Sequence, residues 1–271
     1  MSLRDWLLQA ESRLAEAGIE TPRVEARLLA AHGLGKTKAW ILTHGEDPVE
    51  GSALEPWLLR RERREPLAHL TGTREFYGRP FRVTADTLVP RPDTETLVEL
   101  SLELAPMHGR VLDVGTGTGC IGITLALERP DLRVTLIDVS ERALRVAREN
   151  AEALGAEVEL EQSDLYGNLD SEPFDLIVSN PPYIRAAEPL MPEVARFEPA
   201  LALFAGGDGL DFYRRLALET PSRLTGGGQL AIEIGYDQAE TVPGLFAESG
   251  WRQIAQRPDL AGIVRALAFE R

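Results

Sequence analysis

The sequence predicts an α/β protein with a doubly wound, mostly parallel sheet and a small helical domain at its N-terminus. From residue 110 onward, short apolar runs alternate with segments of helical periodicity, whereas residues 1–72 carry helical periodicity alone. A glycine-rich stretch, Gly115–Gly119, directly follows the first apolar run. The stretch therefore lies at the carboxyl end of a predicted strand, and in open α/β sheets ligands bind at that edge.

Residues 1–72 are expected to form a small helical domain. Apolar residues recur at helical spacing over residues 3–14, and Gly18 is the expected stop of that helix. A second helix is expected after Pro22, and a third over residues 54–64. The three helices together predict a small bundle.

Residues 73–92 are predicted to form a β-hairpin that joins this domain to the rest of the chain. Aromatic and β-branched residues in this region are separated by Gly78, Pro80 and Asp86, which favour turns. The following helix has Asp93 as its candidate cap, because a carboxylate is favoured beside the free amide groups of a helix N-terminus.

Residues 93–271 are expected to form one α/β domain. The predicted strands are residues 111–114, 134–138, 158–160, 174–179 and 230–234, and the predicted helices include residues 121–127 and 143–154. Strands that alternate with helices form a mostly parallel sheet. The carboxyl ends of such strands share one edge, where binding residues are expected to collect.

Composition and charge narrow the possible function classes. The chain has 271 residues, of which 44% are hydrophobic and 27% charged, as in ordinary globular proteins. Residues 1–75 carry 11 basic and 12 acidic side chains, and the remainder carries 18 and 31, so most of the net charge of −14 lies on the α/β domain. Such a domain lacks the broad positive surface of a duplex-DNA-binding protein.

Cysteine usage and hydropathy favour a cytoplasmic protein. Cys120 is the single cysteine, so no internal disulfide framework or cysteine-rich metal site is expected. The start of the chain lacks the pattern of a signal peptide, and no apolar run approaches the roughly 20 residues of a membrane-spanning helix. Neither a membrane nor a stable nucleic-acid partner is therefore expected.

The glycine-rich stretch has the pattern of a nucleotide-type binding turn. It consists of Gly115, Thr116, Gly117, Thr118 and Gly119. Glycines permit a tight turn and let the backbone approach a ligand closely. Asp138 ends the next strand, where an acidic side chain suits the two hydroxyls of a ribose. Glycines alone also occur in purely structural turns, but with Asp138 in place the pattern favours a ribose-bearing ligand.

Asp164 and Leu165 follow the third predicted strand at the same edge of the sheet. The Asp164 carboxylate is a candidate acceptor for an adenine NH2 group, with Leu165 against the ring. An exposed loop aspartate is the alternative interpretation. Its position in register with Gly115 and Asp138 favours the adenine contact.

The tetrapeptide Asn180-Pro181-Pro182-Tyr183 ends the strand of residues 174–179 in a stiff elbow, because neither proline can donate to a sheet. The Asn180 side-chain oxygen and the Pro181 carbonyl can accept both N–H groups of a planar NH2 group and stabilise charge that develops on its nitrogen. Tyr183 can lie against the same planar group. A proline-rich turn without function is the alternative.

The glycine turn with Asp138 and Asp164 resembles class I methyltransferases that use S-adenosylmethionine. The Asn180–Tyr183 elbow narrows this resemblance to enzymes that methylate amino or amide nitrogens. Together with Thr87–Glu95, these motifs resemble the release factor glutamine methyltransferase family over essentially the whole chain. Supporting stretches are Pro66–Gly72 and Phe197–Pro199.

The resemblance implies a Rossmann-like class I methyltransferase sheet and a cytoplasmic enzyme, expected to be a monomer. Its implied substrate is the glutamine of the Gly-Gly-Gln loop in bacterial peptide chain release factors, methylated on the side-chain N5. Its implied donor is S-adenosylmethionine, which leaves as S-adenosylhomocysteine. The helical domain is implied to help dock the release factor, which makes the release factor the expected protein partner.

The resemblance also assigns site residues. Gly115–Gly119 and the position of Leu165, aromatic in some relatives, contact the donor, and Asp138 contacts its ribose. Asn180 touches both donor and acceptor, and Pro181, Pro182 and Tyr183 complete the glutamine pocket, so that Asn180, Pro181 and Tyr183 are the candidate catalytic residues.

Two other motifs are interpreted structurally. Gly227-Gly228-Gln229 spells the motif of the implied substrate, but it precedes an apolar strand and is predicted to be a turn. The run from Arg60 to Arg64 can touch phosphate groups, although charge runs of this kind usually form a solvated helix face, which is the expectation here.

Three alternatives to a release factor substrate stay open from the sequence. Glutamine methylation of a ribosomal protein uses the same chemistry. Adenine-N6 methylation of DNA or RNA would place a flipped base at the same elbow, which the acidic α/β domain disfavours. A donor-binding module that docks on translation factors without turnover is the non-enzymatic alternative.

Overall fold

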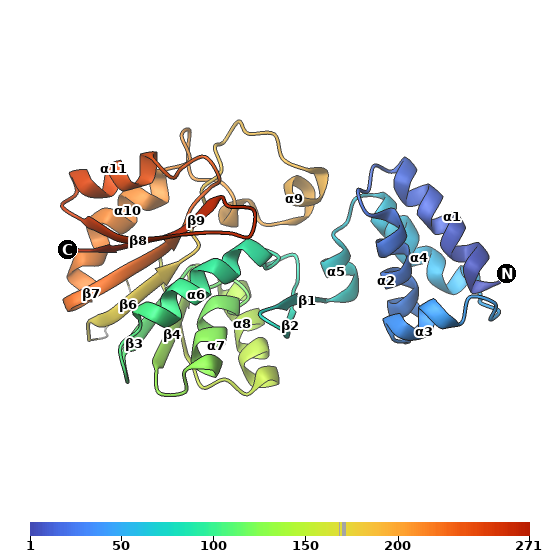
Figure 1. Ribbon diagram of the computed structural model, residues 1–271, viewed down its shortest axis with the longest axis horizontal. Coiled ribbons are helices and arrows are strands. Elements are labelled where there is room, and N and C mark those ends of the chain that lie inside the picture. Colours follow the sequence, from blue (N-terminus) through green and yellow to red (C-terminus); the bar gives the residue numbers. More distant parts are fainter. Residues whose placement is uncertain (168, 170–171) are drawn as a thin grey trace. The chain divides into compact units, whose positions relative to one another are not determined.

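The computed structural model describes residues 1–167, 169 and 172–271, which form two compact units (Figure 1). The first, called the helical unit, comprises residues 1–73 and 190–197. The second, called the α/β unit, comprises the described parts of residues 74–189 and 198–271.

Apolar faces of the longer helices build the core of the helical unit. In α1, Leu3, Trp6 and Leu14 are buried at helical spacing, and Ser2 and Asp5 form a capping box at the N-terminus. The helices of this unit are α1 (Leu3–Glu16), α2 (Pro22–Leu34), α3 (Lys38–Thr43), α4 (Gly51–Glu62), α5 (Leu67–Thr71) and α9 (Pro192–Phe197). The three predicted N-terminal helices are confirmed, and α3 and α5 are additional.

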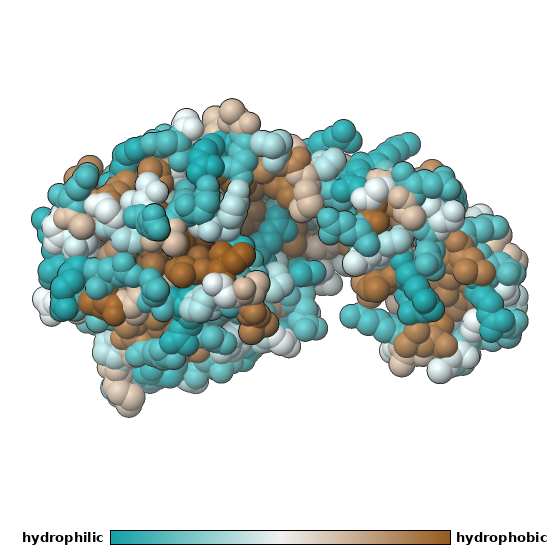
Figure 2. All heavy atoms as spheres, turned by 45° about the horizontal axis from the view of Figure 1, so that its top comes forward, coloured by the Kyte–Doolittle hydropathy of each residue, from teal (hydrophilic) through white to brown (hydrophobic). Residues whose placement is uncertain are grey.

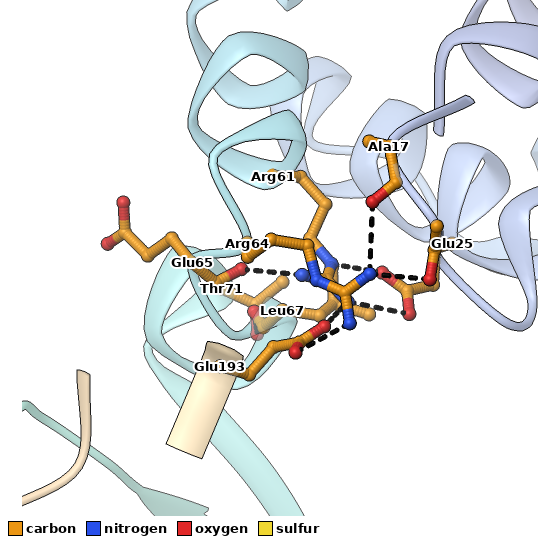
Figure 3. A network of polar contacts seen from close by, with 9 residues as sticks. Ala17, Glu25, Arg61, Arg64, Glu65, Leu67, Thr71 and Glu193 are labelled. Atoms are coloured by element: carbon orange, nitrogen blue, oxygen red, sulfur yellow. Dashed lines mark hydrogen bonds and ion pairs between the residues drawn. The ribbon is translucent and has the colours of Figure 1, made fainter. Parts of the chain in front are cut away.

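The run from Arg60 to Arg64 is only partly the solvated face expected from the sequence, since Arg63 is exposed but Arg61 and Arg64 pair with carboxylates. Arg61 is buried and donates from Nε to Glu25 Oε2 at 2.5 Å and from Nη2 to Glu193 Oε1 at 3.1 Å (Figure 3). Arg64 donates to the other oxygen of Glu193 at 2.7 Å. Glu193 lies on α9, which the sequence placed with residues 93–271 but which the structure groups with the helical unit. Pairing with a carboxylate so distant in sequence leaves no local signal.

The α/β unit is built on a sheet that has seven strands within the described residues, in the order β5-β4-β3-β6-β7-β9-β8. These are β3 (Arg110–Val114), β4 (Arg133–Asp138), β5 (Glu159–Gln162), β6 (Phe174–Ser179), β7 (Leu224–Glu233), β8 (Arg252–Pro258) and β9 (Val264–Glu270). Strands β3 to β7 are parallel, whereas β9 pairs antiparallel with both β7 and β8. Where the sequence predicts a hairpin, β1 (Thr73–Phe76) and β2 (Arg79–Arg82) form a small two-stranded sheet.

Helices cover both faces of this sheet (Figure 1). They are α6 (Glu95–Leu104), α7 (Cys120–Glu128) and α8 (Glu141–Leu154) on one face, α10 (Asp211–Glu219) and α11 (Thr241–Glu248) on the other, and the short 3-10 helices η1 (Pro92–Thr94), η2 (Ala200–Ala202) and η3 (Thr220–Arg223). Alternate strand residues enter the two cores: Val111 packs with α6 and α7, and Leu112 packs with α10 and α11. Burial of both faces explains the continuous apolar runs in the sequence and confirms the predicted fold class.

The strand order creates a switch point between β3 and β6. The chain moves outward from β3 to β4 and β5, and then returns to place β6 on the other side of β3. The loops that leave β3 and β6 therefore diverge, which opens a crevice at the carboxyl ends of these two strands. Gly115–Gly119 and Asn180–Tyr183 begin these two loops.

The C-terminal part of the sheet differs from the sequence-based expectation. Strands β8 and β9 were not predicted, and Gly227–Gln229 is not the expected turn but part of β7. The pairing of β6 with β7 shifts there, from Phe174 opposite Leu224 to Leu176 opposite Gln229. Three successive small or polar residues suggest a turn locally, whereas pairing with β6 keeps them in a bulged strand. No helix in the described part of the chain is long and apolar enough to cross a membrane.

Candidate active site

A cavity lies in the α/β unit at the carboxyl ends of the central strands. The loops after β3, β4, β5 and β6 all line it. Most of the predicted site residues take part, namely Gly115, Thr116, Gly117, Thr118, Asp138, Asp164, Leu165, Asn180, Pro181 and Pro182. Gly119 and Tyr183 are the two predicted site residues that do not line it.

The turn of Gly115–Gly119, called the glycine loop, depends on backbone conformations that other residues rarely adopt. Gly115, Gly117 and Gly119 have φ angles of 71°, 56° and 82°. Gly119 also packs tightly, since a Cβ atom there would lie 2.5 Å from Ile123 Cδ1. The loop therefore turns sharply from β3 into α7 and leaves its backbone open to the cavity, while Gly119 serves the turn itself.

Asp113, which no motif had indicated as a site residue, supports the glycine loop through hydrogen bonds from Thr116 and Gly122. Its fully buried carboxylate accepts from the Thr116 hydroxyl at 2.6 Å and from the Gly122 amide at 3.0 Å. Burial raises the pKa of Asp113 to about 6, although both hydrogen bonds oppose that rise. The signal in the sequence that could have identified Asp113 is an acidic residue inside the apolar run of β3.

Asp138 lies where a ribose-binding carboxylate is expected. Its Oδ2 accepts from the Gly117 amide at 3.0 Å, and its Oδ1 accepts from the Ser140 amide at 2.9 Å. Burial raises its pKa, and these amide hydrogen bonds lower it. A carboxylate has about four lone-pair sites, so each oxygen can still accept from a hydroxyl. The orientation of Asp138 thus fits a vicinal diol bound beside the glycine loop.

Asp164 and Leu165 have different surroundings. Leu165 is buried, with a φ of 49°, and contributes an apolar wall to the cavity. The Asp164 side chain is 63% exposed and lies 2.8 Å from Nη1 of Arg215. An apolar contact of Leu165 with a ring fits this geometry, while Asp164 already has a charged partner at the rim.

The Asn180–Tyr183 elbow begins at the other side of the switch point. The Ser179 hydroxyl donates to the Val114 carbonyl at 2.8 Å and so ties the end of β6 to the end of β3. The Asn180 Nδ2 donates to Thr94 Oγ1 at 3.2 Å. This bond uses the amino end of the Asn180 amide and leaves the Oδ1 end to accept from a ligand.

Tyr183 packs behind the elbow instead of lining the cavity. Its carbonyl accepts from Nε2 of Gln238 at 3.3 Å, and a Cβ at Gly235 would lie 3.3 Å from its ring. Burial raises the pKa of Tyr183 well above its ordinary value. The described geometry is that of a neutral ring that supports the turn.

Two segments that line the cavity were not predicted to do so. Residues 86–94 and residues 199–202 contribute walls, and Glu198 connects them. The buried Glu198 carboxylate accepts from Nη2 of Arg91 at 2.5 Å and from the Val89 amide at 3.2 Å. Both stretches had contributed to the family resemblance, but their meeting depends on the tertiary fold.

Two buried polar residues close to Asn180 were also missed, Thr94 in the cavity lining and Glu233 outside it. Thr94 and Glu233 are each 2% exposed. Burial raises the pKa of Glu233 to about 7, while hydrogen bonding from Thr94, the charge of Arg265 and hydrogen bonding from Asn180 lower it. An acidic residue at the end of the apolar β7 was the available signal, as at Asp113 in β3.

Cys120 contributes a protonated thiol to the cavity. Cys120 lines it, and burial raises the pKa of its thiol to about 12, so the thiolate is disfavoured. Within the described residues, no group of three or more His, Cys, Asp or Glu side chains is placed to hold a metal ion.

Comparison with known proteins places these features in a family. The methyltransferase small domain family matches residues 92–197, and the PrmC N-terminal domain family matches residues 5–72. The release factor glutamine methyltransferase of Cereibacter sphaeroides is 46% identical over 97% of this chain and 96% of its own length. That of Bordetella pertussis is 46% identical over 93% and 95%.

A solved structure agrees at the level of the fold. The methyltransferase from Pyrococcus furiosus superposes with a TM-score of 0.56 at 20% identity, covering 78% of this chain and 97% of its own. From the near full-length sequence identities, the chain belongs to the release factor glutamine methyltransferase family.

Proposed function

We propose that this protein transfers a methyl group from S-adenosylmethionine to the side-chain amide nitrogen of the glutamine in the Gly-Gly-Gln loop of peptide chain release factors. The observation that carries the proposal is the meeting of the glycine loop and Asp138 with Asn180–Pro182 in one cavity. Family membership supports the choice of donor and acceptor.

The donor half of the site is built from backbone and one carboxylate. The glycine loop presents backbone to the donor, and Asp138, oriented by the Gly117 and Ser140 amides, accepts from the ribose hydroxyls. Leu165 supplies apolar contact for the adenine ring. When bound, the donor supplies an electrophilic methyl group on a sulfonium centre.

The acceptor half of the site must overcome the poor nucleophilicity of an amide, whose nitrogen lone pair is delocalised into the carbonyl. Asn180 Oδ1 and the Pro181 carbonyl accept hydrogen bonds from the two N–H groups of the glutamine amide. These bonds orient its nitrogen and stabilise the positive charge that develops on it. Proline fixes the direction of that carbonyl. No base is needed before transfer, because the departing proton becomes acidic once the nitrogen is alkylated.

The helical unit, with residues 1–72 as its main part, is proposed to help dock the release factor. We also propose that the protein acts as a monomer without a stable nucleic-acid partner. The α/β part of the chain carries most of the net charge of −14, which supports a protein substrate over a phosphate backbone.

The test is methyl transfer from labelled donor to a purified release factor, compared with the same factor carrying Gln→Ala in its Gly-Gly-Gln loop. Label is expected only in the unmodified factor. Equal labelling of both factors would contradict the proposal. Purified ribosomal proteins and adenine-containing DNA and RNA, tested in parallel, check the two remaining acceptor classes.

A further inference from the structure

Glu233 lies beside Asn180 at the adjoining ends of β7 and β6. The two parallel strands pair Ser179 with Ile232, and Asn180 and Glu233 are the next residues of each. The Glu233 backbone is fixed on both sides, since its carbonyl accepts from the Tyr213 hydroxyl at 3.1 Å and it pairs with Ala266 of β9. The backbone of Glu233 is therefore held in place next to Asn180.

A short polar chain connects Glu233 to the site. Asn180 Nδ2 donates to Thr94 Oγ1 at 3.2 Å, so the single hydroxyl proton of Thr94 is left for another acceptor. The candidate acceptor is the Glu233 carboxyl group, which follows the β7 residue paired with Ser179. Hydrogen bonding with Thr94 and with Asn180 lowers its pKa, so both side chains lie close to it. Glu233 Oε2 is buried and has no hydrogen-bond partner among the described residues, so this oxygen is free to accept a hydrogen bond.

This arrangement distinguishes the two ends of the Asn180 amide. An ionised carboxylate only accepts hydrogen bonds, so it favours Nδ2 on its side. In the reversed orientation, Oδ1 of Asn180 would face Thr94 and the carboxylate. Its NH2 group would then face the NH2 group of the substrate amide, so that two donors would oppose each other. Such a mismatch is costly because the two groups behind the amide, Thr94 and Glu233, are buried and have no access to water in its place.

We infer that Glu233 is a positioning residue, which acts with Thr94 to hold the Asn180 amide with Nδ2 inward and Oδ1 toward the methyl acceptor. The inference rests on the proposed function for the identity of that acceptor. Glu233 does not line the cavity and takes no part in bond making. Its effect is on the orientation of Asn180 alone.

Protonation of Glu233 would remove this preference, because a carboxylic acid can donate to Oδ1. Five other titratable or charged groups act on it from the surrounding elements: Arg265 of β9, Asp93 of η1, Cys120 of α7, Tyr183 of the elbow and Tyr213 of α10. Arg265 is itself paired with Asp93 and Asp259, each at 3.0 Å. With the pKa of Glu233 raised to about 7 by burial, kcat is expected to fall as the pH is lowered through about 7.

The experiment compares E233M with E233Q, and T94V with T94S, using kcat and KM for the release factor and the Kd of S-adenosylhomocysteine. Methionine and valine remove the acceptor or the hydroxyl at similar volume, serine keeps the hydroxyl, and glutamine mimics the protonated acid because its NH2 group can also donate. We expect kcat to fall about 10- to 100-fold in E233M and T94V and to stay within about fivefold of wild type in T94S, whereas E233Q should have, at every pH, a kcat near the value that wild type reaches below pH 7. The Kd of S-adenosylhomocysteine should change by less than about threefold in all four.

Two further readouts separate positioning from a structural effect. The acid limb of kcat near pH 7 should disappear in E233Q, because glutamine does not titrate. In 15N-labelled protein, exchange of the Asn180 side-chain NH2 protons should be slow in wild type and T94S and fast in E233M. T124V is the matched control, because it removes a buried hydroxyl of α7 that lies outside the cavity lining, and it should leave all these values unchanged.

Wild-type kcat in E233M and T94V, or an unchanged acid limb in E233Q, would overturn the inference. If E233M does not fold, the comparison of kcat between T94V and T94S tests the same positioning role. If wild-type protein transfers no methyl group to a release factor, the proposed function fails, and exchange of the Asn180 NH2 protons still decides the positioning role.

Discussion

The glycine loop and the Asn180–Tyr183 elbow stand on opposite sides of one switch point but are built differently. In the glycine loop, Gly115, Gly117 and Gly119 set the geometry through their own positive φ angles, within five consecutive residues. In the elbow, two prolines stiffen the backbone, but the decisive side chain, Asn180, is held by Thr94 from a distant part of the chain. One half of the site is thus local in sequence, and the other is not.

Because the two halves are built from different parts of the chain, we expect donor binding and acceptor positioning to be separable in this fold. Each half nevertheless has a buried carboxylate behind it, Asp113 under the glycine loop and Glu233 behind the elbow. Burial raises the pKa of both, and hydrogen bonds from the supported segment lower it. Substitutions beside the glycine loop should therefore change donor binding, and substitutions beside the elbow should change the positioning of the acceptor.

The largest expected effect is that of N180A on the elbow. Removing the Oδ1 acceptor takes away a group that is proposed to stabilise charge in the transition state, so kcat should fall about 100- to 1,000-fold. The glycine loop is untouched, and the Kd of S-adenosylhomocysteine, measured by calorimetry, should change by less than about threefold. Turnover near that of wild type would refute the role of Asn180.

On the donor side, D138A should show the reverse pattern. It removes the carboxylate that accepts from the Gly117 and Ser140 amides and is proposed to hold the ribose. The Kd of S-adenosylhomocysteine should weaken about 10- to 100-fold, since hydrogen bonds to charged groups contribute about 1.5–3 kcal/mol. At saturating donor, kcat should stay within about threefold of wild type. A large loss of kcat there would show that the two halves are coupled.

D113N tests the support of the glycine loop through pH. The pKa of Asp113 is raised to about 6 in the folded protein, above its ordinary value of 3.8, so folding favours its protonated form. Its contribution to stability is therefore present at low pH and is lost as the pH rises through about 6. Between pH 5 and pH 7.5, the free energy of unfolding of wild type relative to D113N should fall by on the order of 1 kcal/mol.

Urea unfolding of both proteins across this pH range measures that difference. A constant difference would show that Asp113 keeps the same charge in the folded and unfolded chains.

The smallest expected effect is that of D164A at the rim of the cavity. Exposure of Asp164 and its pairing with Arg215 favour a loss of donor affinity of about threefold or less. R215A is the control, because it frees Asp164 without removing it and should leave the affinity unchanged. A loss in D164A as large as that in D138A would establish the adenine contact predicted from the sequence.

Features encoded over a few residues were predictable. The alternation of strands and helices, the glycine loop, Asp138 at the end of β4 and the proline elbow all follow from local patterns. The sequence missed β8 and β9 and took Gly227–Gln229 for a turn, because pairing with neighbouring strands decided those segments. It also took Arg61 for a solvated residue, because its partner Glu193 lies on α9.

By itself, the sequence determined the class of fold, the switch-point motifs and the chemical types of the groups at the site, since backbone freedom at glycine and rigidity at proline are properties of single residues. Only the tertiary structure decided which buried groups stand behind those motifs. Strand order and register bring Thr94 and Glu233 to Asn180, and they turn Tyr183 away from the cavity lining. Such contacts join residues far apart in the chain, and no local pattern specifies them.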